Sequence, residues 1–123
     1  MATEPQRPPA RTPDARLTAD FWVHAYIRRC QLANIPAYVT AKGDATAGAV
    51  LVKLATLDGQ AQLFQRSFDL MTGNRSWVTL AKGAEPEIDL TIHRQRQYDP
   101  DLWVIEIESR SGQPLLEEDG LST

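Results

Sequence analysis

Two β-type segments on either side of Asp58-Gly59 constrain the fold of this chain more than any other feature. Gly48–Thr56 precedes the dipeptide, and Gln60–Phe68 follows it. The first segment places apolar side chains at every second position, namely Val50, Val52 and Leu54. Alternation with a period of two is typical of a β-strand, and Asp-Gly is a strong signal for a two-residue hairpin. Because Ala49 and Leu51 make the other face of the first segment partly apolar, we expect this strand to lie inside a sheet.

Three further segments have the composition of strands. Ala37–Ala41 precedes the hairpin, and Ser76–Lys82 follows it. Leu102–Ser109 is the clearest of the three, because apolar residues at 103, 105 and 107 alternate with Glu106 and Glu108. The first four strands in chain order predict a meander of about four antiparallel strands.

A helix is predicted at the start of the folded part. Thr18 is a good N-cap, and Leu17 can pack as a staple onto Trp22. Apolar residues then recur at helical spacing and form one stripe, which consists of Trp22, Val23, Tyr26, Ile27 and Cys30. Pro36 ends this helix.

The segment Glu85–Gln97 has two interpretations. Ile88, Leu90 and Ile92 alternate, which favours a strand. Pro86 suits a first helical position, however, and the acidic start and basic end of the segment suit a helix dipole. We therefore predict a helix here.

These elements predict a single α+β domain over residues 16–116. The order is α-β-β-β-β-α-β, with a mainly antiparallel sheet of about five strands. Such a sheet suits helices packed together on one of its faces. The proline-rich residues 1–15 and the acidic residues 117–123 contain few large apolar side chains, so we expect two disordered tails.

Charge and cysteine content narrow the class of protein. The net charge is -3, of which the first 16 residues carry +1 and the last seven carry -3. The body is therefore close to neutral, so a nucleic-acid partner is unlikely on charge grounds. One cysteine, no signal-peptide pattern and no long apolar segment favour a cytoplasmic location without a membrane partner.

Four pieces of the chain resemble a small family of uncharacterised proteins found mainly in alphaproteobacteria. The resemblance spans roughly residues 16–112 and is carried by Arg16–Cys30 (RLTADFWVHAYIRRC), Gly43–Gly48, Leu57–Gly59 and Tyr98–Glu108 (YDPDLWVIEIE). Because the family is a domain of unknown function, the resemblance implies a bacterial, cytoplasmic setting and no mechanism.

An acidic cluster is the strongest candidate for catalytic chemistry. Asp99 and Asp101 flank a proline, and Glu106 and Glu108 follow on the predicted strand. Carboxylates from neighbouring strands hold divalent ions in metal-dependent nucleases, so Asp101, Glu106 and Glu108 are candidate metal ligands. The lysine that usually follows is absent from this sequence. The alternative is that the aspartates shape a turn and the glutamates form the solvent-exposed face of an edge strand.

Other reactive residues have structural explanations. Cys30 lies on the core stripe, which favours a buried, inert thiol over a nucleophile. His24 suits a solvated helix face, and two histidines with one cysteine are too few for a structural zinc site. Gly43–Gly48 lacks the Gly-Lys-Ser/Thr ending of a phosphate loop, so we expect a flexible loop between strands. The three tryptophans lie on the apolar sides of the predicted helix and strands, so we expect them in the core. A ligand pocket lined by them is the alternative.

Two basic spots are candidates for a binding surface. Arg28 and Arg29 lie on the first predicted helix, and Arg94 and Arg96 lie on the second. If both helices lie side by side, these arginines form one patch near aromatic residues, as on partner-binding surfaces. The alternative is ordinary charge at helix C-terminal ends.

The sequence contains no catalytic or cofactor signature. The leading interpretation is a small, non-catalytic module that binds another protein through its helical face or an open sheet edge. A metal-dependent phosphoesterase that uses the acidic cluster and a weak RNA binder that uses the four arginines remain alternatives. No cofactor is predicted, and the sequence leaves the oligomeric state open.

Overall fold

The computed structural model describes residues 18–68, 71 and 75–116. Two helices and five strands occur in the predicted order. They are α1 (Ala19–Leu32), β1 (Ala37–Ala41), β2 (Val50–Ala55), β3 (Gln60–Phe68), β4 (Arg75–Ala84), α2 (Glu85–Tyr98) and β5 (Trp103–Glu108). The ambiguous segment is a helix with Pro86 in its first turn, as predicted. The predicted tails at 1–15 and 117–123 lie outside the described residues.

The five strands form one sheet in the order β1-β5-β2-β3-β4. The antiparallel meander is confirmed for β2, β3 and β4 but is wrong for β1. β5 lies between β1 and β2, antiparallel to the first and parallel to the second. The physical reason is burial, because Val104 and Ile105 point to opposite faces of β5 and both are buried. A strand with two apolar faces needs neighbours on both sides.

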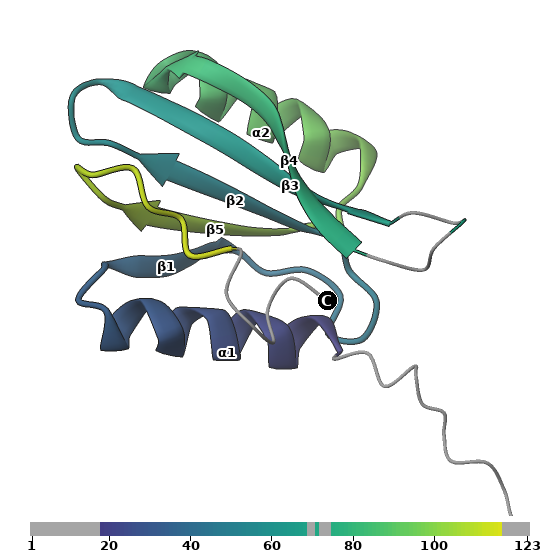
Figure 1. Ribbon diagram of the computed structural model, residues 1–123. Coiled ribbons are helices and arrows are strands. Elements are labelled where there is room, and N and C mark those ends of the chain that lie inside the picture. Colours follow the sequence, from purple (N-terminus) through teal and green to yellow (C-terminus); the bar gives the residue numbers. More distant parts are fainter. Residues whose placement is uncertain (1–17, 69–70, 72–74, 117–123) are drawn as a thin grey trace, which may run out of the picture.

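The two helices cover opposite faces of the sheet, which Figure 1 shows with α1 below and α2 above. The expectation that they share one face is wrong. On one face of β2, Val50, Val52 and Leu54 join the core that α1 covers. On the other face, Leu51 packs in a second cluster with Ile88 of α2. Two helices are therefore needed to bury the two apolar faces of β2.

The start of α1 is capped by the backbone of a distant loop. Thr18 is the N-cap residue of α1, as predicted, but its side chain makes no capping bond, because its hydroxyl donates to Asp20 Oδ1 at 2.9 Å. The amide of Ala19 donates to Thr46 O at 3.1 Å, and that of Asp20 donates to Ala45 O at 2.9 Å. The loop between β1 and β2 thus satisfies helix donors that would otherwise face water. Leu17, the predicted staple, lies outside the described residues.

This loop is held firmly, so the expectation of a flexible connection is wrong. The amide of Asp44 donates to Asp101 O at 2.9 Å, and Trp103 Nε1 donates to Asp44 O at 2.7 Å. Asp44 Oδ2 also accepts from the amides of Thr46 and Ala47. The loop therefore ties the start of α1 to the turn before β5.

The predicted hairpin is present, but its turn differs from the expected two-residue form. Thr56 N donates to Gln60 O at 3.2 Å, which leaves a three-residue loop of Leu57, Asp58 and Gly59. Leu57 and Gly59 both have positive φ, of 65° and 88°. Asp58 Oδ1 accepts from the hydroxyl of Thr56 and the amide of Gln60, and these hydrogen bonds hold the pKa of this carboxyl below its usual value.

Among the described residues, neither helix is both long and apolar enough to cross a lipid bilayer.

The contact between the β1–β2 loop and Asp101 generates a test of packing. A Cβ atom at Gly48 would lie 2.5 Å from the backbone oxygen of Asp101. We expect Gly48→Ala to lower the free energy of unfolding by about 2 kcal/mol, because backbone must move to admit the methyl group. Gly83→Ala is the control, since its Cβ would meet nothing nearer than Glu87 Oε1 at 3.5 Å. Equal stability of both variants in urea unfolding would contradict this packing.

Candidate functional site

A buried lysine lies at the centre of the sheet. Lys53 is on β2, on the face covered by α2, and only 3% of its surface is exposed. Its ammonium contacts Glu85 Oε2 at 2.7 Å, Asp89 Oδ1 at 2.7 Å and Glu106 Oε1 at 3.5 Å. Of the three donors of the ammonium, two form hydrogen bonds with Glu85 and Asp89, and Glu106 lies at ion-pair distance. We call these four residues the Lys53 cluster.

The cluster fixes the charge state of its lysine. Burial alone would lower the pKa of Lys53, but hydrogen bonds to Asp89 and Glu85 and the charge of Glu106 outweigh it and raise the pKa above 10.5. One positive and three negative groups leave a formal charge of -2 on the cluster. The side chain of Asp89 is 57% exposed, so it presents part of this excess to solvent.

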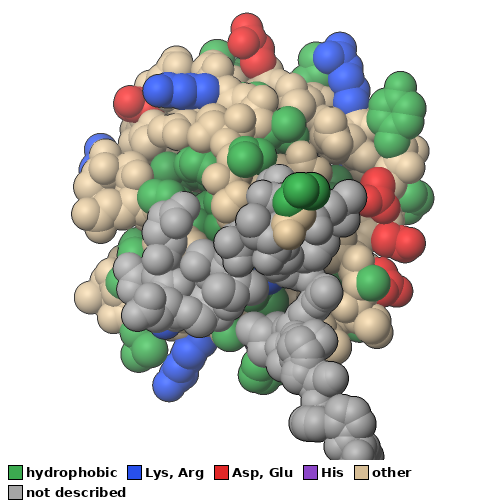
Figure 2. All heavy atoms as spheres, turned by 45° about the vertical axis from the view of Figure 1, so that its right-hand side comes forward, with side chains coloured by type: hydrophobic (Ala, Val, Ile, Leu, Met, Phe, Trp, Pro, Cys, Tyr) green, Lys and Arg blue, Asp and Glu red, His purple; other side chains and the backbone are tan. Residues whose placement is uncertain are grey.

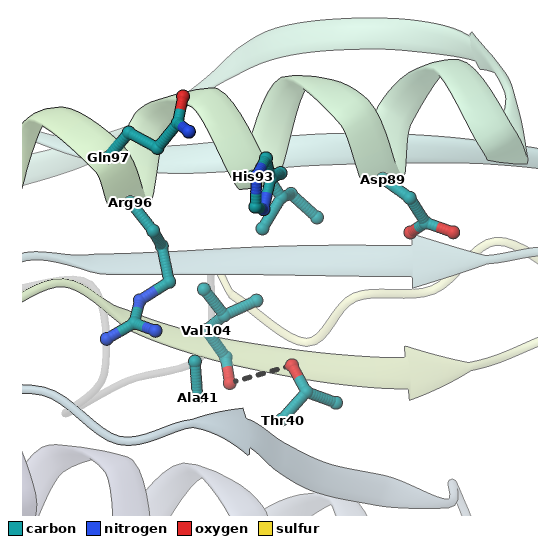
Figure 3. A pocket seen from close by; sticks show the side chains of 8 residues that line it. Thr40, Ala41, Asp89, His93, Arg96, Gln97 and Val104 are labelled. Carbon is teal, nitrogen blue, oxygen red and sulfur yellow. Dashed lines mark hydrogen bonds between the residues drawn. The ribbon is translucent and has the colours of Figure 1, made fainter. Parts of the chain in front are cut away.

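A groove lies beside the cluster, between α2 and the β5–β1 side of the sheet. Its volume is about 420 Å³. Residues of α2 form one wall, and Thr40, Ala41 and Val104 of the sheet form the other side. Figure 3 shows Asp89, His93 and Arg96 projecting from α2 toward these strands. The groove is therefore polar along the helix and largely apolar along the sheet.

Opposite charges mark the two ends of the helical wall. Asp89 and Arg96 are seven residues apart, which is two helical turns or about 10 Å. Arg96 Nε donates to Leu102 O at 3.2 Å, and Nη2 donates to Pro100 O at 2.8 Å and to Lys42 O at 3.4 Å. Arg96 thus closes its end of the groove by holding the turn before β5, whereas the end at Asp89 carries the surplus negative charge.

The groove adjoins an edge of the sheet. β1 is the first strand in the sheet order, and it pairs with β5 alone among the described strands. Glu108 N donates to Pro36 O at 3.1 Å, which identifies residues 36 and 108 as a hydrogen-bonded pair. Such pairs alternate in an antiparallel ladder, so the N–H and C=O groups of Ala37 and Val39 point away from β5. The edge therefore offers two residues whose backbone polar groups face outward.

The predicted basic residues are not brought together. Arg28 and Arg29 lie on α1, whereas Arg94 and Arg96 lie on α2, across the sheet. In the view of Figure 2, Lys and Arg side chains are scattered over the surface. Only Arg96 lines the groove. The four arginines therefore do not form one patch, because the two helices that carry them lie on opposite faces of the sheet.

The candidate metal ligands are also separated. Glu106 binds Lys53, whereas Asp101 lies in the turn before β5 and Glu108 ends that strand. Asp101 and Glu108 are seven residues apart, which corresponds to about 23 Å along an extended chain. Within the described part of the chain, no three His, Cys, Asp or Glu residues gather as a possible metal site. The interpretation of β5 as an edge strand is wrong, because β5 is internal.

The other candidates have the structural surroundings expected of them. Cys30 is buried, and burial raises the pKa of its thiol, which disfavours the reactive thiolate. Trp22 stacks on Tyr26 with ring centroids 5.0 Å apart and lies 5.2 Å from Trp77. Trp103 packs in the same core. His24 lies on the exposed side of α1.

Sequence reasoning missed Lys53 and Asp89. The available signal was a lysine within a strand whose neighbours on both faces are apolar. Glu85 and Asp89, four residues apart on one predicted helix, were the matching pair of carboxylates.

Replacement of the buried lysine tests the energetic role of the cluster. We expect Lys53→Met to lower the free energy of unfolding by about 2 kcal/mol, because three carboxylates are left without their shared cation. The cost stays below that of a fully buried pair because Glu85 and Asp89 can turn to water. Lys82→Met, at an exposed position of β4, should change stability by less than about 0.5 kcal/mol. Equal effects in denaturant unfolding would refute this role.

The raised pKa of Lys53 predicts a change at alkaline pH. The folded state holds this proton more tightly than the unfolded state, so the resulting stability is complete at neutral pH and declines as pH rises through the folded pKa, above 10.5. The stability difference between the native chain and Lys53→Met should therefore shrink above pH 10.5. Unfolding curves recorded from pH 8 to 11.5 measure it, and a constant difference would argue against the lysine as its source.

Comparisons with known proteins place the chain in a family. A crystal structure of a DUF1491 family protein from Caulobacter crescentus CB15 has 43% sequence identity and a TM-score of 0.76, and the match covers 84% of this chain and 97% of that one. An NMR structure of a DUF1491 family protein from the same strain matches with 43% identity, a TM-score of 0.73 and coverage of 83% and 94%.

A more distant structure has the same fold. Protein Atu0922 from A. tumefaciens has 32% identity and a TM-score of 0.68, with 86% of this chain and 91% of that chain covered. A search of curated proteins gave no significant match. The model of the family described as "Protein of unknown function (DUF1491)" matches residues 17–117. The family resemblance noted in the sequence is thus confirmed, and the chain belongs to the DUF1491 family.

Proposed function

We propose that this chain is a small, non-catalytic protein-binding module that accepts an extended segment of a partner along strand β1. The observation that carries the proposal is the open edge of β1 beside the groove. Addition of a strand to an exposed sheet edge is a common mode of peptide recognition, in which main-chain hydrogen bonds supply affinity and nearby pockets supply specificity.

The edge supplies the main-chain part of such recognition. Ala37 and Val39 direct their backbone donors and acceptors outward, and a partner strand would pair with both residues. The side chains of Tyr38 and Val39 are 50% and 39% exposed, so they leave apolar surface for the partner to cover. β4 is the other edge, but the groove adjoins β1, which favours β1 as the binding edge.

The groove supplies the side-chain part. Successive side chains of a strand point to opposite faces, so every second side chain of an added strand would point to the face covered by α2. That face holds the groove, whose volume of about 420 Å³ is within the usual range for ligand sites. His93 and Ile92 form the centre of its helical wall.

The state of the one buried lysine supports a non-catalytic role. A lysine nucleophile or base needs a free lone pair, which burial or a neighbouring cation supplies by lowering the pKa. The pKa of Lys53 is raised instead, and its ammonium donates to Glu85 and Asp89 and forms an ion pair with Glu106. Lys53 therefore stays protonated and holds the neighbouring carboxylates in place.

A proline in the edge strand tests the proposal. Val39→Pro removes an outward N–H without removing a bond to β5, and proline is tolerated at such edge positions. A partner recovered from an alphaproteobacterial lysate by the tagged native chain should be recovered at least about tenfold less by this variant, because an edge hydrogen bond is lost and the partner strand is obstructed.

Val39→Thr is the matched control, since it keeps both the N–H and the β-branched side chain. The capture is run with and without nuclease and quantified by mass spectrometry, with thermal unfolding to verify that each variant is folded. Full recovery of every specific partner by folded Val39→Pro would exclude the β1 edge. Loss of all partners after nuclease treatment would point to nucleic acid instead.

A further inference from the structure

We propose that the acidic segment 117–119 folds back onto the α1 side of the sheet and pairs its carboxylates with Arg66, which lies over the rings of Trp22 and Trp77. We call these three residues the Arg66 site, and its occupant is a segment of the same chain. The proposal is independent of strand addition at β1, which concerns the opposite edge of the sheet and the groove on its α2 side.

The Arg66 site lies on a part of the sheet that α1 covers incompletely. The strand residues buried in the core on this face belong to β2 and β5, whereas Phe64 of β3 and Trp77 of β4 are only partly buried. Arg66 pairs with Trp77 across β3 and β4, and directly paired residues share a face of a sheet. This half of the face can therefore accept a further segment.

Aromatic rings position the cation of the site. The guanidinium carbon of Arg66 lies 5.1 Å from the ring centroid of Trp22 and 5.9 Å from that of Trp77, so cation–π attraction favours this place. The N–H donors of a guanidinium lie in its plane, where a carboxylate can accept two of them. Neither β3 nor β4 contains an Asp or Glu residue, so a carboxylate for Arg66 comes from another segment.

An indole group of the same site also requires a partner. Trp77 Nε1 is buried, and no acceptor for it is found among the described residues. An indole N–H is usually hydrogen-bonded when it is buried, so this donor indicates an acceptor that lies outside that part of the chain. Because Arg66 and Trp77 are neighbours, one acidic segment can serve both groups.

The chain leaves the core at this site with the required charge. Leu116 is buried in the core cluster that contains Trp22, and Tyr26, which stacks on Trp22, donates its hydroxyl to Pro114 O. The last described residues, yellow in Figure 1, thus follow the aromatic cluster. Residues 117–119 are Glu, Glu and Asp, and three extended residues span up to about 10 Å, twice the 5.0 Å between the stacked rings. The segment therefore has the charge and the reach to meet the guanidinium.

Carboxyl pKa values measured by NMR titration test the pairing. In the native chain, at least one carboxyl group of residues 117–119 should have a pKa about 0.5 or more below its value in Arg66→Gln, because a nearby cation favours the ionised form. Arg110→Gln is the matched control and should leave these pKa values unchanged, since Arg110 is exposed and closer in sequence to the acidic segment. Equal pKa values in the native chain and folded Arg66→Gln, or a rise in Arg110→Gln alone, would overturn the proposal.

A variant of the acidic segment keeps the test decisive if Arg66→Gln unfolds. The triple substitution Glu117→Gln, Glu118→Gln and Asp119→Asn lies outside the two helices and five strands, so the domain should stay folded. Exchange of the Arg66 Nε–H with water should then become at least about tenfold faster than in the native chain, because a charge-assisted hydrogen bond is lost. Unchanged exchange would overturn the proposal.

Dilution distinguishes the segment of the same chain from that of a second copy. A contact within one chain does not depend on protein concentration, so the pKa values and the exchange rate should be unchanged when the protein is diluted. A lowered carboxyl pKa that returns to its usual value on dilution would assign the occupant to another copy and overturn the proposal.

Discussion

The arrangement of this protein depends on a single buried ammonium group. Lys53 lies on the central strand, and its three carboxylates come from α2 and β5. A buried charge is costly unless it is paired, so α2 must keep Glu85 and Asp89 over β2 for the fold to be stable. That requirement, together with the apolar contact between Leu51 and Ile88, keeps the helix over the β2–β4 half of the sheet and leaves a groove along the β5–β1 half.

The same cluster brings a negative group to the surface of the fold. Its cation is enclosed, whereas one of its carboxylates reaches the surface. The protein therefore holds a negative group in a defined position at the end of a groove and beside a free edge. Rigid placement of a charge lowers the entropic cost of any contact made with it.

Much of the secondary structure could be predicted because its signals are local. The bounds of Ala37–Ala41 and Gln60–Phe68 match the observed strands, and Pro86 with its acidic neighbours marks the start of α2. The order of strands could not be predicted in the same way. The insertion of β5 between β1 and β2 is a pairing of residues more than 50 positions apart, and local alternation carries no information about such neighbours.

The site was only partly predictable for a related reason. Arg96 and Glu106 were singled out, but their roles come from partners on other elements, namely the turn carbonyls and Lys53. Lys53 resembles an ordinary strand lysine until both faces of β2 are known to be covered. The polar side of a single helix likewise does not reveal that Asp89 turns toward a buried cation.

The most direct measurement is amide hydrogen exchange by NMR on the native chain, free and bound to a peptide selected for binding from a random display library. We predict that the amides of Ala37 and Val39 exchange rapidly in the free protein, because they face solvent, and slow markedly in the complex, because the partner strand accepts from them. Unchanged exchange at both amides in a saturated complex, with protection at β4 or α1 instead, would contradict the assignment of β1 as the binding edge.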